Sequence, residues 1–248
     1  MPSANRLTAY LVIVFATLSG GGSLLLFGAF LIAGPFTVVH LNMSGRLALL
    51  WDVLLSAAFF LQHSGMVRTS FRRWLSSLIP DHYYAAAYSI TSGVVLAAVV
   101  LLWQPSHTSL FEAQGLLAIP FYAAFILAMA GFAWGVRAIG TFDPFGGLAI
   151  LSHLNHKRQT SNLAIRGPYL WVRHPLYFFM LVFIWATPSL SLDRLLFNVL
   201  WTFWIVVGSY LEEKDLVAEF GQSYRHYQDT VPMLLPWRGP VGRIFETP

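Results

Sequence analysis

The chain has 248 residues, of which 56% are hydrophobic and only 10% are charged, and its mean hydropathy is +0.61. Soluble domains carry about 25% charged residues, so this composition excludes a water-soluble globular protein and indicates a polytopic membrane protein. The formal net charge of +4 does not indicate a nucleic-acid partner, because Lys and Arg are spread over loops, and the lack of cysteine excludes disulfides, thiolate metal sites and thiol nucleophiles.

Six apolar segments follow one another along the chain and predict an all-α, polytopic integral membrane bundle of about six transmembrane helices. They cover residues 8–33, 47–61, 84–103, 115–138, 176–187 and 195–211. Because a helix needs about 20 apolar residues to cross a bilayer, the second and fifth segments are short. The first segment is expected to be a retained span, since no convincing signal-peptide cleavage site lies near its end.

Small and polar residues inside these segments predict how the helices pack. Gly93, Gly131 and Gly135 interrupt the third and fourth segments and favour close helix contacts. The Gly20-Gly21-Gly22 triplet predicts a kink or a close-packing point in the first segment. Asp52 lies in the second segment, where a carboxylate facing lipid is costly, so we expect it to face the bundle interior.

The basic residues predict the orientation of the chain. If both termini are cytosolic, every Lys and Arg except Arg46 and Arg194 falls on a cytosolic segment, as the positive-inside rule requires. We therefore expect a single domain, residues 1–248, in the inner membrane of a bacterium with the N and C termini in the cytosol. The sequence leaves the oligomeric state open.

The last apolar segment is expected to continue beyond the membrane. Residues 195–220 follow one helical pattern that stops at Gly221, a residue typical of the position after a helix end. A helix of about 39 Å exceeds the roughly 30 Å hydrocarbon core. Its final turns, with Glu212 and Glu213, would then stand at the cytosolic interface, and the aromatic stretch 224–237 would cover them as a lid.

The first candidate site combines two polar motifs on the same side of the membrane. Arg173-His174-Pro175-x-Tyr177 follows a chain break and leads into a helix, whose N-terminus favours an anion. The hairpin of the fifth and sixth segments brings Glu212-Glu213 to this end, where carboxylates accept hydrogen bonds from ribose hydroxyls or an ammonium. The combination predicts a pocket for a zwitterionic or nucleoside ligand. Separately, the motifs would be typical of a basic juxtamembrane loop and a solvated helix face.

The second candidate site is Gln62-His63-Ser64 at the end of the second segment. His63 would orient an acceptor or serve as a general base. The alternative interpretation is an interfacial helix end, because the nearby Arg68, Arg72 and Arg73 can extend their charged groups to the headgroups.

Several motifs keep a fixed order and spacing in the C-terminal region: Gly167-Pro168-Tyr169, Arg173-His174-Pro175-x-Tyr177, Glu212-Glu213-x-x-Leu216, Phe220-Gly221-x-x-Tyr224-x-x-Tyr227 and Val231-Pro232-x-x-x-Pro236. This pattern resembles the integral-membrane methyltransferase superfamily, which includes isoprenylcysteine carboxyl methyltransferases and phospholipid N-methyltransferases. Together with residues 185–188, 211–217 and 231–234, the central motifs Gln62-His63-Ser64-x-Met66-x-Arg68 and Trp103-Gln104-Pro105 look like the methanethiol S-methyltransferase branch of the NnrU-like proteins.

The resemblance implies a methyltransferase that depends on S-adenosyl-L-methionine, with a cofactor region at about 164–238. The implied cofactor-binding residues are Tyr169, His174, Pro175, Tyr177, Glu212, Glu213 and Leu216, and the candidate catalytic residues are His174, Arg173 and His63. No metal site is predicted. The implied acceptor is a small thiol, methanethiol or hydrogen sulfide, which arrives from the membrane lipid and leaves as a methyl sulfide such as dimethyl sulfide.

Other functions stay open from the sequence. The segment His63-Ser64-Gly65 is similar to one through which some NnrU-like isomerases bind haem, and an isoprenylcysteine or a phospholipid would be another methyl acceptor. A sterol-reductase-like use of NADPH is disfavoured, because six spans leave little of that larger bundle. The loop after the fourth span departs from the thiol methyltransferase branch: Ala149-Ile150 stands where the branch has Arg-Gln, which leaves the acceptor open.

Overall fold

A computed structural model of the protein describes residues 3–36, 38–140, 142–156 and 165–241. Residue 164, the first of the predicted cofactor region, lies outside these ranges. The elements are α1 (Ser3–Ala33), α2 (Gly45–Val67), α3 (Thr69–Leu75), η1 (Asp81–Tyr83), α4 (Tyr84–Leu102), β1 (Ser109–Glu112), η2 (Gly115–Ala118), α5 (Ile119–Ile139), α6 (Gly147–Leu154), η3 (Gly167–Leu170), α7 (Pro175–Trp185), β2 (Ser189–Ser191), α8 (Leu192–Phe220) and α9 (Gln222–Thr230). The predicted helical architecture is confirmed.

Within the described residues, five helical segments are long and apolar enough to cross a membrane: α1, α2, η1 with α4, η2 with α5, and α8. The second predicted segment is not short, because α2 continues through the polar Gln62-His63-Ser64 to Val67. The fifth segment does stay short. Helix α7 has 11 residues, and its rise of about 16 Å is roughly half of the hydrocarbon core.

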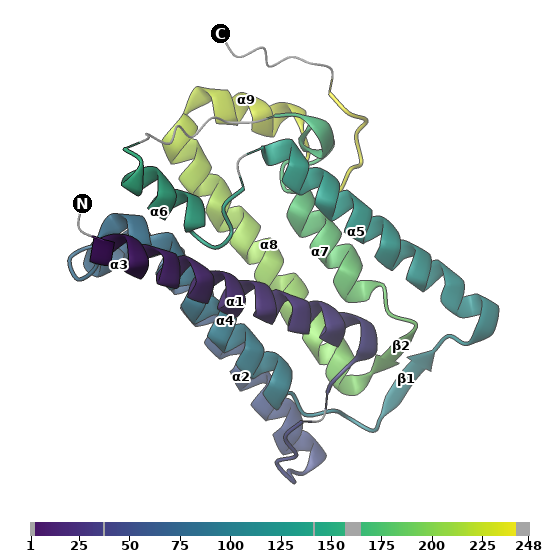
Figure 1. Ribbon diagram of the computed structural model, residues 1–248. Coiled ribbons are helices and arrows are strands. Elements are labelled where there is room, and N and C mark those ends of the chain that lie inside the picture. The colour runs from purple at the N-terminus through teal and green to yellow at the C-terminus, as the bar shows by residue number, and fades with distance from the viewer. Residues whose placement is uncertain (1–2, 37, 141, 157–164, 242–248) are drawn as a thin grey trace. The chain divides into compact units, whose positions relative to one another are not determined.

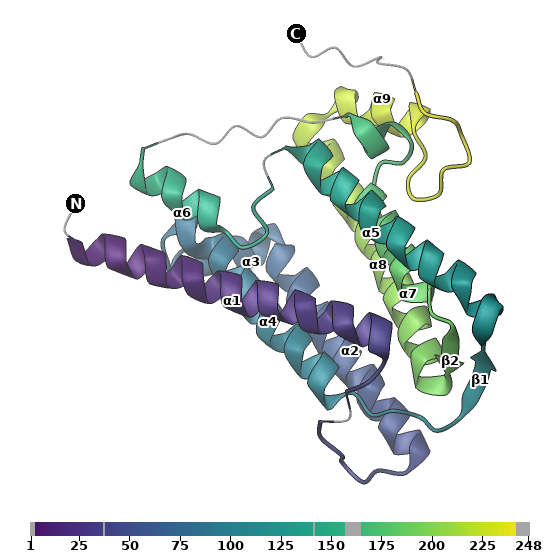
Figure 2. The ribbon, with the colours of Figure 1, turned by 45° about the vertical axis from the view of Figure 1, so that its right-hand side comes forward.

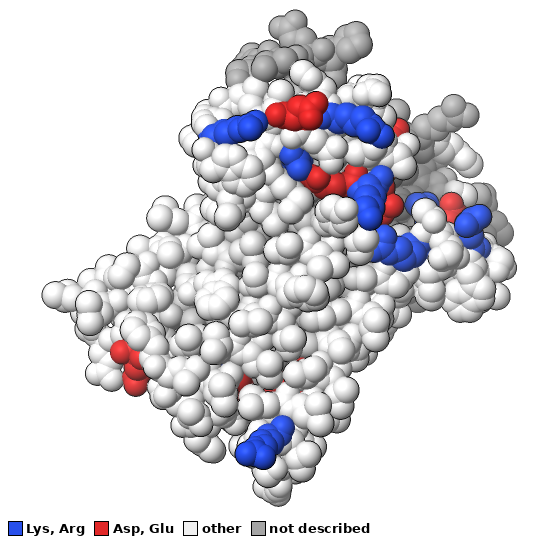
Figure 3. Space-filling model, turned by 180° about the vertical axis from the view of Figure 1, so that it is seen from behind, with Lys and Arg blue, Asp and Glu red and all other residues white. Residues whose placement is uncertain are grey.

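The chain divides into two compact units. Unit 1 comprises residues 1–108, 143–160 and 192–197, and unit 2 comprises 109–142, 161–191 and 198–248. Whether the two units form one domain is not tested, so the single domain 1–248 stays a prediction. Broad areas of the face in Figure 3 carry no charged side chain, as expected of a surface that meets lipid.

In unit 1, α1 and α2 both pack against α4 (Figure 1). Close approach requires small residues here: a Cβ at Gly93 would lie 2.7 Å from the Ser19 carbonyl oxygen, and one at Gly20 would lie 2.8 Å from the Phe145 ring. Helix α1 runs unbroken through the glycine triplet, so the triplet includes a close-packing point and does not end the helix.

Buried polar side chains hold the loops of unit 1. Asp52 is fully buried, as predicted, and its Oδ1 accepts a hydrogen bond from the Gln104 backbone N–H at 2.9 Å. The Gln104 side chain donates to the carbonyls of Val39 and Leu102 and accepts from the Leu41 N–H.

The carboxylate of Asp193 completes this group of polar contacts in unit 1. It accepts from Trp103 Nε1 at 3.1 Å and from the Ser106 N–H at 3.0 Å. We call Asp52, Trp103, Gln104 and Asp193 the Gln104 cluster. In three of these hydrogen bonds, an aspartate of the cluster accepts from a backbone N–H or from the Trp103 indole. The cluster therefore holds the chain that follows α4 in place.

In unit 2, α5 and α7 pack side by side (Figure 2), again through glycines. A Cβ at Gly131 would lie 2.1 Å from the Phe179 ring and one at Gly135 would lie 2.7 Å from Leu176, so the predicted close contacts are confirmed. The short strands β1 and β2 pair antiparallel, with Phe111 opposite Leu190. Helix α8 ends at Phe220, before Gly221 at φ +59°, as the sequence predicted.

Candidate functional site

Unit 2 brings Arg173, His174 and Glu213 together in a buried cluster. Arg173 donates from Nε to Glu213 Oε1 at 2.5 Å and from Nη2 to Oε2 at 2.9 Å, which is a bidentate ion pair. His174 Nε2 lies 3.2 Å from the same Oε1. The side chains of Arg173 and Glu213 are each only 9% exposed, so water screens this ion pair poorly.

The segment before α7 is anchored so that these side chains are presented together. Arg166 Nε donates to the Ala138 carbonyl at 2.6 Å, at the C-terminal end of α5, where a cation is favoured. Gly167 has φ +60°, and a Cβ there would lie 3.2 Å from Ala138. His174 is the N-cap residue of α7, and Pro175 occupies its first turn, as predicted.

Helix α9 adds two further donors to Glu213. Tyr224 donates its hydroxyl to Oε1 at 3.4 Å, and Gln228 donates Nε2 to Oε2 at 2.9 Å. Arg173 in turn donates from Nη1 to the Gln228 carbonyl at 2.9 Å. We call Arg173, His174, Glu213, Tyr224 and Gln228 the Glu213 cluster. Both carboxylate oxygens of Glu213 are therefore fully engaged by the protein.

The chain after α9 returns along the segment before α7. The backbone N–H groups of Arg173 and His174 donate to the carbonyls of Pro232 and Met233, at 2.9 and 3.1 Å. Arg173 also donates from Nη1 to the Val231 carbonyl. These bonds fasten the aromatic tail over the cluster, where the sequence predicted a lid.

Three tyrosines in or beside the Glu213 cluster keep their protons. Burial raises the pKa of Tyr169 to about 12, with a further contribution from the charge of Glu212. Burial also raises the pKa of Tyr224 and of Tyr227 far above the ordinary value. Their hydroxyls therefore act as donors at neutral pH, and Tyr227 donates to the Tyr169 carbonyl at 2.6 Å.

Glu212 differs from its neighbour Glu213. Its side chain is 44% exposed, and its Oε2 lies 3.8 Å from His174 Nδ1. This oxygen is buried and has no hydrogen-bond partner among the residues that the structure describes. Of the two carboxylates, Glu212 is thus the one with an oxygen that accepts no hydrogen bond from the described residues.

The other predicted cofactor-binding residues belong to the same unit. The Tyr177 ring stacks on the His174 ring, with centroids 5.5 Å apart and planes at 19°. Leu216 packs on the buried side chains of Tyr224 and Tyr227. These residues, with Tyr169 and Pro175, all belong to unit 2, so the predicted set comes from one unit.

Sequence reasoning did not assign Tyr224 or Gln228 to the site. Tyr224 belongs to the spaced aromatic motif of the tail, which was a usable signal. Gln228 lies four residues after Tyr224 and hence on the same face of α9. That helical spacing is the only sequence signal for it, and it requires the bounds of α9 to be known.

The third candidate catalytic residue, His63, lies on α2 in unit 1. Its Nε2 is 2.7 Å from the Tyr88 hydroxyl, and its ring lies 5.1 Å from the ring of Phe59. His63 is not a member of the Glu213 cluster, and its catalytic role stays a prediction. In the part of the chain that the structure describes, no three His, Asp or Glu side chains gather as a metal site would require.

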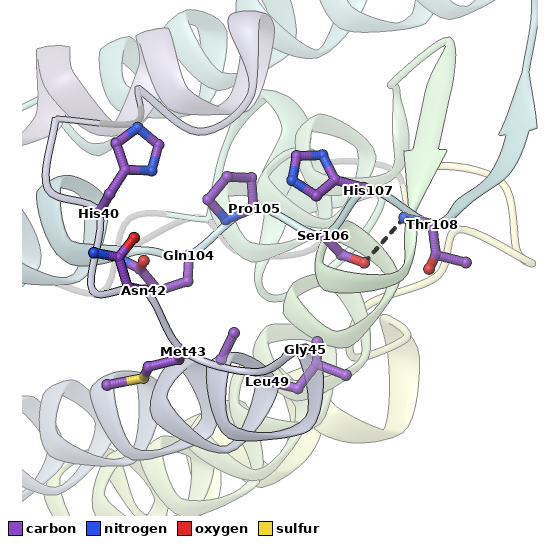
Figure 4. A pocket seen from close by; sticks show the side chains of 11 residues that line it. His40, Asn42, Met43, Gly45, Leu49, Gln104, Pro105, Ser106, His107 and Thr108 are labelled. Atoms are coloured by element: carbon purple, nitrogen blue, oxygen red, sulfur yellow. Dashed lines mark hydrogen bonds between the residues drawn. The ribbon is translucent and has the colours of Figure 1, made fainter.

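A cavity of about 430 Å³ lies in unit 1 (Figure 4). Residues of the α1–α2 loop, including His40 and Asn42, line it together with residues that follow α4, from Gln104 to Thr108. Ser106 Oγ accepts a hydrogen bond from the Thr108 N–H at 3.2 Å (Figure 4). No predicted site residue lines this cavity. Of the Gln104 cluster, Gln104 alone is among the residues that line it.

Comparison with known proteins finds several relatives with one name. The chain is 38% identical over 199 residues to a methanethiol S-methyltransferase of Pseudomonas sp. (strain GM41(2012)), covering 77% of this chain and 75% of that protein. It is 38% identical to the enzyme of that name from Pseudomonas deceptionensis, covering 78% and 74%, and 36% identical to that from Crocosphaera subtropica, covering 77% and 76%. No family model matches the chain, and no solved structure matches it.

Proposed function

Since the chain belongs to the methanethiol S-methyltransferase family and is a methyltransferase, we propose that it moves a methyl group from S-adenosylmethionine to a small thiol. The observation that carries the cofactor assignment is the free oxygen of Glu212 beside the N-terminus of α7. Glu212 Oε2 lies 3.8 Å from the side chain of His174, the N-cap residue of α7. A carboxylate beside a positive helix end matches the ammonium and carboxylate of a zwitterion.

The residues of unit 2 fit this cofactor. Glu212 would accept a hydrogen bond from a hydroxyl or the ammonium, because its Oε2 is buried without a partner among the described residues. The α7 N-terminus would favour the carboxylate. Tyr177 and Leu216 would supply apolar surface. Glu213 would hold Arg173 and His174 in place and would not itself contact the cofactor, since its oxygens already have protein partners.

The cofactor supplies an electrophilic methyl group on a positively charged sulfur. The chain's part is to hold the acceptor sulfur in line with that methyl group and to exclude water, which favours a reaction in which charge is lost. His174 is only 6% exposed, which supports a site from which water is excluded. Positioning therefore accounts for most of the catalysis that we propose.

We assign the acceptor as methanethiol or hydrogen sulfide, because the relatives are named for methanethiol. With methanethiol the product would be dimethyl sulfide. Such small, uncharged thiols dissolve in lipid, which suits a site at the end of membrane helices. The distribution of Lys and Arg further supports an inner-membrane location with both termini in the cytosol.

Calorimetry on the detergent-solubilised protein tests the cofactor site. We expect wild type to bind S-adenosylhomocysteine, Glu212→Ala to bind at least ~10-fold more weakly, as the loss of a charged hydrogen bond implies, and the matched control Glu219→Ala to bind within about twofold of wild type. Folded wild type that binds neither S-adenosylmethionine nor its product would refute the proposal. Headspace detection of methyl sulfides with methanethiol and with hydrogen sulfide then identifies the acceptor.

A further inference from the structure

His174 lies between two carboxylates that contact its two ring nitrogens differently. Nε2 is within hydrogen-bonding distance of Glu213 Oε1, at 3.2 Å. Nδ1 faces Glu212 Oε2 at 3.8 Å, which is beyond hydrogen-bonding distance. One side of the ring is therefore bonded to a carboxylate, and the other side is only near one.

This asymmetry identifies the nitrogen that carries the proton. Glu213 is held by Arg173 as an ionised acceptor, so Nε2 must be the donor in the short contact. If Nδ1 carried a proton as well, Glu212 Oε2 would be its natural acceptor. That oxygen instead has no hydrogen bond among the described residues, which agrees with an Nδ1 that carries no proton.

We propose that Glu213 fixes the Nε2–H form of His174, so that Nδ1 is the base that accepts the proton of the thiol during methyl transfer. Glu213 is then a positioning residue, and His174 is the catalytic one. The inference rests on the proposed thiol methylation. It goes beyond it by naming the accepting atom and a separate role for each carboxylate.

The reaction balances with these groups alone. The S–H proton of the acceptor passes to His174 Nδ1, and the acceptor sulfur forms a bond to the methyl carbon. The bond from that carbon to the sulfonium sulfur breaks, and its electron pair stays on the latter sulfur. His174 becomes an imidazolium, which the ionised Glu213 stabilises through the Nε2–H and which later releases the proton to water.

Neighbouring groups keep the ring in this orientation. Tyr177 stacks on one face of the imidazole. The Tyr224 hydroxyl, a donor, shares Glu213 Oε1 with the ring and cannot accept the proton in its place. Arg173 balances the charge of Glu213, so the proton stays on the imidazole nitrogen rather than on the carboxylate.

Nitrogen NMR of histidine-labelled wild type tests the protonation state without any cofactor. The His174 signals, assigned through their contacts with the Tyr177 ring, should show a protonated Nε2 and an unprotonated Nδ1 at neutral pH. Glu213→Gln, whose amide can donate to Nε2, should shift the proton toward Nδ1. A protonated Nδ1 in wild type would overturn the proposal, even if no variant folds.

A second measurement separates proton transfer from binding. His174→Asn should lose at least ~100-fold in the rate of methanethiol methylation, measured at saturating S-adenosylmethionine so that a change in cofactor affinity does not enter the rate. The defect should shrink with an acidic aromatic thiol that is already ionised at the assay pH. Equal defects with both thiols would overturn the assignment. A wild type that methylates no thiol would instead refute the proposed function, while the NMR result would still stand.

Discussion

The two polar clusters of this protein are both buried among apolar helices, but they are built differently. In the Gln104 cluster, carboxylates and an amide mostly satisfy backbone groups, and Asp52 is fully buried. In the Glu213 cluster, one carboxylate accepts hydrogen bonds from Arg173, Gln228 and Tyr224, and the neighbouring Glu212 is partly exposed. Polarity inside a membrane protein therefore does not by itself mark a site. The two clusters differ instead in what their carboxylates contact, which is mainly backbone N–H groups in the first and ionisable or polar side chains in the second.

The largest expected loss of stability follows from removing the carboxylate of Glu213, which pairs with Arg173 at the centre of the Glu213 cluster. Glu213→Ala leaves the Arg173 guanidinium buried without its partner, so we expect the free energy of unfolding to fall by about 3–5 kcal/mol. Titration with SDS in mixed micelles measures it. A loss below about 1 kcal/mol would contradict the view that Glu213 organises the cluster.

The corresponding change in the other cluster should affect stability alone. Asp193→Ala strands the indole N–H of Trp103 and the Ser106 N–H, so we expect a loss of about 2–4 kcal/mol in unfolding free energy. Affinity for S-adenosylhomocysteine should stay within about threefold of wild type in the folded protein. A selective loss of cofactor affinity would break the distinction between the clusters.

Two glutamines give a matched test of the same distinction. Gln104→Ala removes the acceptor of the Leu41 N–H and should cost about 1–3 kcal/mol of stability without altering cofactor binding. Gln228→Ala removes one donor to Glu213 and should cost about 1 kcal/mol. Only the second should weaken S-adenosylhomocysteine binding. Calorimetry on both variants decides the point, and the reverse pattern would contradict it.

The smallest expected change in stability belongs to Glu212. Because its Oε2 has no hydrogen bond among the described residues, Glu212→Gln should keep the unfolding free energy within about 0.5 kcal/mol of wild type. The rate of thiol methylation at low S-adenosylmethionine should nevertheless fall, since the amide lacks the charge that we propose pairs with the cofactor's ammonium. A stable variant with an unchanged rate would remove Glu212 from the mechanism.

The sequence predicted most of the fold because apolar length and chain breaks are local signals. The end of α8 at Phe220 was predictable from Gly221, whereas the extension of α2 to Val67 was not. The polar residues from Gln62 to Ser64 end an apolar pattern, but the backbone hydrogen bonds of a helix continue through them. The pairing of β1 with β2 also had no sequence signal, because each strand has only three or four residues.

The convergence of the two motifs was predictable from the sequence, but the contacts of each residue were not. The motifs around His174 and Glu213 indicated a shared pocket, and the ion pair of Arg173 with Glu213 confirms that these segments meet. The sequence of two adjacent glutamates does not show which carboxylate has both oxygens hydrogen-bonded by the protein. That depends on Gln228 and Tyr224, which reach Glu213 only because α9 folds back over α8.

The length of α8 leads us to expect that the enzyme responds to the thickness of the surrounding bilayer. From Leu192 to Glu213 the helix rises about 32 Å, close to the roughly 30 Å thickness of the hydrocarbon layer. If Leu192 lies at one boundary, the ion pair of Glu213 lies near the other, where we propose that S-adenosylmethionine from water and a thiol from lipid meet. Longer acyl chains would place this cluster within the hydrocarbon layer and slow the exchange of the proposed cofactor. We therefore expect the catalytic rate to depend on membrane thickness.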